Sequence, residues 1–123
     1  VRDYASLLQL SEGYSVHELH VRDDDWLCER ELGDLGLRKE GMLVLGIERD
    51  DEYFGVPDAT SKILAGDTVL VYGQTDSLMQ LDERRRGHGG DTEHERAAAD
   101  QERAEREQKQ RERRSEREHA VED

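Results

Sequence analysis

Apolar side chains stop abruptly two thirds of the way along this 123-residue chain. From Asp82 onward almost every residue is charged, polar, glycine or alanine. A packed core needs apolar side chains to bury, so the folded unit must come from about the first 80 residues. The charge divides at the same point: up to Leu81 the chain has 7 Lys and Arg against 17 Asp and Glu, and after it 11 against 14. The sequence therefore predicts a small acidic domain followed by a densely charged tail.

The composition argues against several classes of protein. Nucleic-acid affinity depends mainly on lysine and arginine, so a chain with a net charge of −13 is not expected to bind DNA directly. Cys28 is the only cysteine, which excludes an internal disulfide and favours a reducing compartment. The longest apolar run, residues 42–47, is far shorter than the roughly 18 residues of a membrane span, and no signal-peptide pattern is present. Because the sequence starts at Val1, we expect a soluble piece of a longer protein.

Four segments have the composition of β-strands: residues 14–21, 42–49, 53–54 and 67–73. The second is a nearly continuous apolar run, which predicts a central strand buried on both faces. The acidic residues 50–52 are placed at the turn of a β-hairpin, and Pro57 ends the returning strand because proline cannot donate to the ladder. Gly66 and Asp67 form the turn into the last strand, with Gly66 supplying backbone freedom.

Helical periodicity is confined to short segments, expected over residues 3–10, 25–33 and 75–81, with a turn or loop at 60–64. The first segment could equally be a linker. In the second, Asp25 is placed to cap a helix that Gly33 would end. In the third, Thr75 or Asp76 is placed as the N-cap of a closing helix.

The charged tail begins after a glycine-rich break at residues 87–90. From Asp91 it contains strong helix formers and favourable pairs four residues apart, such as Glu102 with Arg106. The apolar seam that a coiled coil requires is missing. A solvated single helix, or disorder, is therefore expected in preference to a coiled coil.

No set of residues in the sequence has the pattern of a catalytic or metal site. His17 and His20 are three apart in a predicted strand and so face opposite sides, which disfavours joint chelation. The acidic runs 23–25 and 50–52 fall in predicted turns, without an apolar pocket to raise a carboxyl pKa. Cys28 is expected to be a packing residue, because no histidine neighbours it in sequence. No enzyme activity and no cofactor are therefore expected.

The segment from Val16 to Leu81 resembles a TrkA-C domain, the C-terminal lobe of the regulator of potassium conductance (RCK) module. The residues that carry the resemblance are Trp26-Leu27 with Leu32, Leu35 and Leu37; Val44, Ile47 and Arg49 on one strand; Pro57; and Ile63, Gly66-Asp67, Val69, Val71 and Gly73 at the end. The resemblance implies an α+β fold with a small antiparallel or mixed sheet of about four strands and two short helices.

The resemblance also implies a function, which is a ligand-sensing and dimerising lobe attached to potassium channels, potassium uptake systems or other transporters. Some members of the family bind cyclic di-AMP between two lobes, which makes Ile47, Arg49, Val56 and Pro57 the ligand-binding candidates in this chain. Each candidate has a structural alternative. Arg49 could instead pair with Asp50 or Asp51 at the hairpin end, Ile47 and Val56 could be core residues, and Pro57 could be only a strand stop.

We therefore expect three parts: a linker or short helix from an upstream membrane part at residues 1–13, a TrkA-C-like domain at 14–81, and the charged tail at 82–123. The leading hypothesis is a non-enzymatic regulatory domain of a potassium channel or cation transport protein, working as a homodimer on the cytoplasmic face of the membrane. Its partner would be an upstream transmembrane segment or a potassium transport subunit. The alternative is a structural dimerisation module without a ligand, and a soluble enzyme subunit is a weaker third hypothesis.

Overall fold

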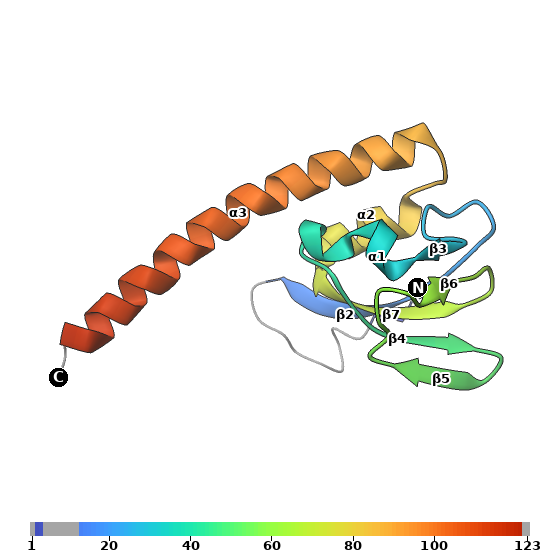
Figure 1. Ribbon diagram of the computed structural model, residues 1–123, viewed down its shortest axis with the longest axis horizontal. Coiled ribbons are helices and arrows are strands. Elements are labelled where there is room, and N and C mark those ends of the chain that lie inside the picture. Colours follow the sequence, from blue (N-terminus) through green and yellow to red (C-terminus); the bar gives the residue numbers. More distant parts are fainter. Residues whose placement is uncertain (1, 4–12, 122–123) are drawn as a thin grey trace.

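The computed structural model describes residues 2–3 and 13–121. Its centre is an antiparallel five-stranded sheet with the order β1-β2-β7-β4-β5. The strands are β1 (Arg2–Asp3), β2 (Tyr14–His20), β4 (Leu43–Arg49), β5 (Glu52–Gly55) and β7 (Thr68–Gln74). Figure 1 shows the short helices on one side of this sheet and a long helix, α3 (His88–Val121), that runs away from it. The expected α+β class, antiparallel sheet and short helices are confirmed.

The core lies between the sheet and the short helices. Val69 of the central strand β7 pairs with Leu19 of β2 on one side and with Ile47 of β4 on the other. These three side chains face the same side of the sheet and are at most 2 % exposed. Leu78 and Leu81 of α2 (Thr75–Glu83) cover them. The alternation of β7 thus places Val69 and Val71 on the helix-covered face, while the less buried Leu70 and Tyr72 lie on the other.

Strand β4 differs from the expectation that it is buried on both faces. Ile47 is buried, but Leu43 is 44 % exposed on the other face, because the described helices all pack on one side of the sheet. A bulge between Val44 and Gly46 also interrupts the pairing of β4 with β7. The hairpin prediction is confirmed: Asp50 and Asp51 form a two-residue turn between β4 and β5, both with positive φ.

The helix predicted from Asp25 to Gly33 is wrong in its start and its end. The Asp25 carboxylate accepts a hydrogen bond from the Arg22 amide, at 2.7 Å, so it closes an earlier turn and does not cap a helix. The helix α1 (Leu32–Leu35) starts later and ends at Gly36, which has a left-handed φ of 61°. A 3-10 helix, η1 (Leu37–Glu40), follows directly.

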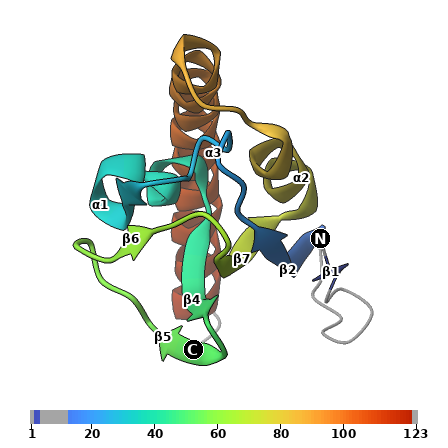
Figure 2. The same ribbon diagram turned by 90° about the vertical axis from the view of Figure 1, so that its right-hand side faces the viewer.

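A second, two-stranded sheet was not expected. It consists of β3 (Arg30–Glu31) and β6 (Lys62–Ile63), where the sequence predicted part of a helix and a turn or loop. Figure 2 shows β6 beside α1, on the side of the molecule opposite α2. The pairing joins segments that lie far apart in the chain, which is a contact that local sequence patterns do not contain.

The closing helix α2 is confirmed, but its cap is not the predicted one. The N-cap residue is Gln74, without a side-chain cap hydrogen bond. The Thr75 hydroxyl is instead engaged with the start of β2, at 2.8 Å from the Ser15 hydroxyl and 2.9 Å from the Gly13 carbonyl oxygen. Tertiary contacts with the strand have taken the place of the local cap.

From His88 to Val121 the charged tail is one α-helix, which is the first of the two states, single helix or disorder, that the sequence left open. The break before it is narrower than predicted: Gly87 has a φ of 114°, while Gly89 and Gly90 are already helical. Within the described residues, none of the helices has the length and apolar character needed to cross a membrane. The helix or linker predicted for residues 3–10 lies outside the described residues, apart from Asp3 in β1.

Candidate functional site

Arg49 ends β4 and is held by a carboxylate that immediately precedes the neighbouring strand β7. Its Nε and Nη2 atoms each donate to Asp67, both at 2.8 Å, and Nη2 also donates to the Lys62 carbonyl oxygen at 2.8 Å. The alternative reading, in which Arg49 pairs with Asp50 or Asp51, is therefore wrong about the direct partner. A bidentate arginine–carboxylate contact fixes the plane of the guanidinium as well as its position.

Asp67 is placed by the turn that the Gly-Asp pair predicted. Gly66 has a φ of 91°, and the Asp67 carboxylate accepts a hydrogen bond from the Leu64 amide at 2.8 Å. The side chain is 1 % exposed. Burial by itself raises the pKa of Asp67, but the hydrogen bonds from Arg49 and Leu64 and the charge of Arg49 outweigh burial and hold the pKa below its ordinary value.

The Arg49 guanidinium keeps unused hydrogen-bonding capacity. Its hydrogen bond to Asp67 raises the pKa of Arg49 above its usual value, against the effect of burial, so the group stays charged. The side chain is 34 % exposed, and among the described residues its Nη1 atom makes no hydrogen bond. The guanidinium carbon also lies 6.0 Å from the centre of the Phe54 ring. Arg49 can therefore offer its Nη1 atom to an anion while Asp67 and the Lys62 carbonyl oxygen hold Nε and Nη2.

Strand β5 beside Arg49 is an open edge with exposed apolar side chains. Phe54 is 42 % exposed, Tyr53 57 % and Val56 89 %. Val56 has a φ of 48°, a strained value for a β-branched residue, and its amide donates to the Leu45 carbonyl oxygen at 2.9 Å. Phe54 lies on the same face of the hairpin as Arg49, whereas Tyr53 points to the other face. An exposed aromatic ring beside a fixed guanidinium can stack on a planar anionic ligand that the guanidinium hydrogen-bonds.

The structure brings only some of the four predicted ligand-binding residues to one place. Arg49 pairs with Glu52 at the turn end of the hairpin, while Val56 and Pro57 follow its other end. Ile47 lies between them in the ladder, opposite Phe54, and is 2 % exposed in the core. The accessible groups are thus Arg49, the half-buried Pro57 and the exposed Val56.

Two residues of this region were missed as site residues by sequence reasoning. Asp67 had been assigned only to its turn, and Phe54 only to the returning strand. The pairing of Arg49 with Asp67 spans 18 residues, so no local pattern contains it. A signal was present in Asp67 itself, because an acidic residue at the start of a buried strand needs a partner.

The other groups considered in the sequence do not form a site. His17 is buried and His20 exposed, on opposite faces of β2, as predicted. Cys28 is 3 % exposed in the core, which confirms a packing role. Within residues 2–3 and 13–121, no group of three or more histidine, cysteine, aspartate or glutamate side chains could hold a metal ion.

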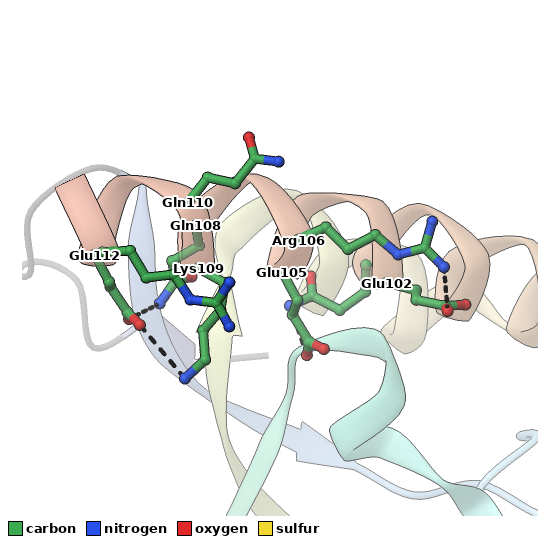
Figure 3. Close-up of a pocket in the computed structure, with 9 residues that line it drawn as sticks. Glu102, Glu105, Arg106, Gln108, Lys109, Gln110 and Glu112 are labelled. Atoms are coloured by element: carbon green, nitrogen blue, oxygen red, sulfur yellow. Dashed lines mark hydrogen bonds and ion pairs between the residues drawn. The ribbon is translucent and has the colours of Figure 1, made fainter.

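A hollow of about 720 Å³ lies along α3 and is lined only by residues of that helix, between Gln101 and Arg113. Figure 3 shows their side chains paired along the helix, with Arg106 donating to Glu102. A surface made of one solvated helix has no opposing wall. This hollow is therefore a groove beside the helix and is not a candidate ligand site.

The chain belongs to the TrkA-C domain family. The sequence model of this domain matches residues 16–85, which is more than half of the chain. TrkA-C domains are regulatory, so the class of protein agrees with the expected one. No sequence among the curated proteins matches significantly.

Solved structures with a similar fold come from BusR of S. agalactiae. The BusR chain in complex with busA-promotor DNA has a TM-score of 0.50 and 22 % identity; the match covers 62 % of this chain and 41 % of that one. The RCK_C domain dimer of BusR in complex with c-di-AMP has a TM-score of 0.49 and 22 % identity, covering 54 % and 88 %. This chain thus spans about two fifths of the BusR chain in the DNA complex, and the likeness is one of fold.

Proposed function

We propose that this domain is a non-enzymatic sensor of an anionic nucleotide, with a cyclic dinucleotide such as cyclic di-AMP as the ligand, bound at the edge formed by β4 and β5. The observation that carries the proposal is the partly exposed Arg49, held by Asp67 with its Nη1 atom unbonded among the described residues. A phosphate oxygen at that atom would accept charge-assisted hydrogen bonds. The membership of a regulatory family and the c-di-AMP complex of the BusR domain support the choice of ligand.

The aromatic side chain of Phe54 supplies the second element of recognition. It lies 6.0 Å from the Arg49 guanidinium and is 42 % exposed, so a purine can stack beside the same group that binds the phosphate. Val56 and Pro57 would contribute apolar contacts further along the edge. Asp50 and Asp51 lie next to the site and repel an anion, so binding needs the fixed geometry of Arg49 and not a general positive field.

A homodimer would complete the site. β5 is the last strand of the sheet and exposes Tyr53, Phe54 and Val56, and a site at such an edge has only one wall. A second copy placed over this edge would enclose a two-fold symmetric ligand between two Arg49 side chains. Ligand binding would then change the relation of two lobes, by as much as its affinity differs between their arrangements.

The upstream partner in this proposal is a transmembrane segment or a subunit of a potassium or cation transporter, and the domain would lie on the cytoplasmic face of the membrane. The resemblance to lobes of that kind is the support for this part. A net charge of −13 argues that the chain itself does not bind nucleic acid.

The test is calorimetric titration of the 123-residue chain with cyclic di-AMP, with sedimentation to measure the oligomeric state. We expect saturable binding at one ligand per dimer, a loss of at least tenfold in affinity in Arg49→Ala, and a smaller loss in Asp67→Asn, which keeps the cation but removes the bidentate contact that orients it. The double variant Arg49→Ala with Asp67→Asn removes the buried unpaired carboxylate, so it separates lost binding from lost stability. Affinity unchanged by Arg49→Ala would overturn the assignment of Arg49.

The alternative function is a structural dimerisation module without a ligand. The exposed apolar side chains of β5 favour it as much as they favour a ligand-bound dimer. A stable dimer that binds neither cyclic dinucleotides nor adenine nucleotides would select this alternative.

A further inference from the structure

The long helix α3 is attached to the domain by a short polar contact. Within α3, the residues that are partly or fully buried all lie from Gly90 to Gln101, and every described side chain after Gln101 is exposed. The contact lies on η1 and on the loop around Trp26. The apolar side chains that α3 contributes to it are alanines, Ala97 and Ala98. Apart from covering Trp26, hydrophobic burial therefore adds little, so the polar contacts contribute much of what keeps α3 docked.

The centre of the contact is a buried carboxylate shared by two basic side chains. Glu40, the last residue of η1, accepts two hydrogen bonds from Arg84, at 2.8 and 2.9 Å, and both side chains are 2 % exposed. The Nδ1 atom of His94, from α3, lies 2.6 Å from Oε2 of the same carboxylate. This distance is at the short end of those typical for charge-assisted hydrogen bonds.

Trp26 forms the other wall of the contact. The His94 ring stacks on the indole, with centroids 5.2 Å apart, and the indole Nε1 donates to Asp91 at 2.9 Å. Gly90 packs so closely that a Cβ there would lie 2.6 Å from the indole and 2.3 Å from the Arg85 carbonyl oxygen. Trp26 is the only tryptophan of the chain, so its fluorescence reports on this contact alone.

We propose that the contact of α3 with η1 is a proton-sensitive latch: protonation of His94 tightens α3 on Glu40 and Trp26, and deprotonation loosens it. Imidazole is the side chain that changes charge between pH 5 and 8. A protonated His94 is a cation against a buried carboxylate; when the ring is neutral that ion pair is lost, while Arg84 keeps Glu40 paired. The sheet and the short helices thus stay folded while the strength of the contact between α3 and η1 changes.

The charged groups around His94 support this direction. The negative groups are Glu40, Asp91 and Glu93, and the Glu93 carboxylate lies 3.4 Å from Arg84. The positive groups are Arg84 and Arg30, whose guanidinium groups both lie over the Trp26 ring, and the more exposed Lys39, which lies beside Gly36. Glu40 is the one in direct contact with the imidazole, and it is shielded from water.

Because α3 is long, a small change at the latch moves the far end of the helix by a large distance. The residues from Glu102 to Val121 extend about 30 Å beyond the contact, at about 1.5 Å per residue. The turn before α3 contains Gly87, whose φ of 114° marks a point where the chain can pivot. Figure 1 shows this part of α3 leaving the domain in one direction. This inference concerns α3 alone and stands or falls independently of the proposed ligand site.

The test compares Trp26 fluorescence and amide hydrogen exchange of the full chain at pH 5.5 and pH 8. After correction for the intrinsic pH dependence of exchange, we expect protection of residues 91–101 to be about tenfold greater at pH 5.5. Protection of α2 should not change. Trp26 emission should fall at pH 5.5, because a protonated imidazole stacked on an indole quenches it.

Three variants make the result decisive. His94→Gln should abolish the pH dependence of both signals, while His88→Gln, on the exposed start of the same helix, should keep it. Gly90→Ala should give the signals of the undocked helix at both pH values, because its methyl group collides with backbone. Equal protection of residues 91–101 at the two pH values in the native chain, or an unchanged pH dependence in His94→Gln, would overturn the latch.

Discussion

Two arginine–carboxylate pairs lie near the two ends of β4, and they differ in exposure. Both are bidentate, with distances of 2.8 to 2.9 Å. Arg84 and Glu40 are each 2 % exposed, and three hydrogen-bonding groups converge on Glu40. Arg49 is 34 % exposed, and its Nη1 atom makes no hydrogen bond within residues 2–3 and 13–121, while Asp67 is buried. The comparison shows that the same kind of arginine–carboxylate pair can serve structure or recognition, depending on how many of the arginine's hydrogen-bond donors solvent can still reach.

The largest expected effect is at the buried pair. Arg84→Ala leaves Glu40 buried without its cation, and we expect a loss of about 3 to 5 kcal/mol in the free energy of unfolding, measured by urea denaturation at pH 7. Arg86→Ala, two residues along and 51 % exposed, is the matched control, with an expected loss below about 1 kcal/mol. Similar losses in the two variants would show that burial does not separate the two arginines.

The second effect is at the edge pair. Arg49→Ala should cost about 1 to 3 kcal/mol in the free energy of unfolding, because Asp67 loses charged hydrogen bonds but keeps the Leu64 amide and gains access to water. Adding Asp67→Asn should recover most of the loss, since the neutral amide needs no cation. A loss in Arg49→Ala as large as that in Arg84→Ala would remove the distinction between the pairs.

A smaller effect should appear in the acid dependence of stability. The folded pKa of Asp67 lies below its ordinary value, so its contribution is fully present above the ordinary carboxyl pKa and is lost as pH falls through the folded pKa. The loss falls in the acid range, below about pH 4. Unfolding by urea between pH 7 and pH 2.5 should show a shallower acid slope for Asp67→Asn than for the native chain. An unchanged slope would mean that Asp67 does not carry this dependence.

The smallest effect is expected where the charges are fully solvated. Glu102→Ala removes the pair with Arg106 on the extended part of α3, and should cost about 0.2 to 0.5 kcal/mol of local helix stability. Amide exchange of residues 102–121 should quicken slightly, while the urea midpoint of the domain stays the same. A shifted midpoint would mean that the extended part of α3 contributes to the core after all.

The sequence predicted the elements that depend on local patterns. The strands at residues 14–21, 42–49 and 67–73, the hairpin turn, the closing helix and the helical tail all appear in the structure. The failures lie where a distant contact outweighs a local preference. Asp25 serves an earlier turn and binds Arg85, Thr75 binds the start of β2, and residues 60–64 contribute a strand to a pairing with β3.

The candidate site follows the same division. Arg49 was identified from a family resemblance, and its pairing with Asp67 across 18 residues comes from the fold. The sequence by itself determined where the core ends, that the tail is charged and without a coiled-coil seam, and the family of the domain, because each depends on composition, short-range periodicity or motif. Only the tertiary structure decided which carboxylate each arginine meets, and therefore which guanidinium keeps donors free. The solvent exposure of a side chain and its partners far along the chain depend on tertiary packing, so they cannot be predicted from the order of neighbouring residues.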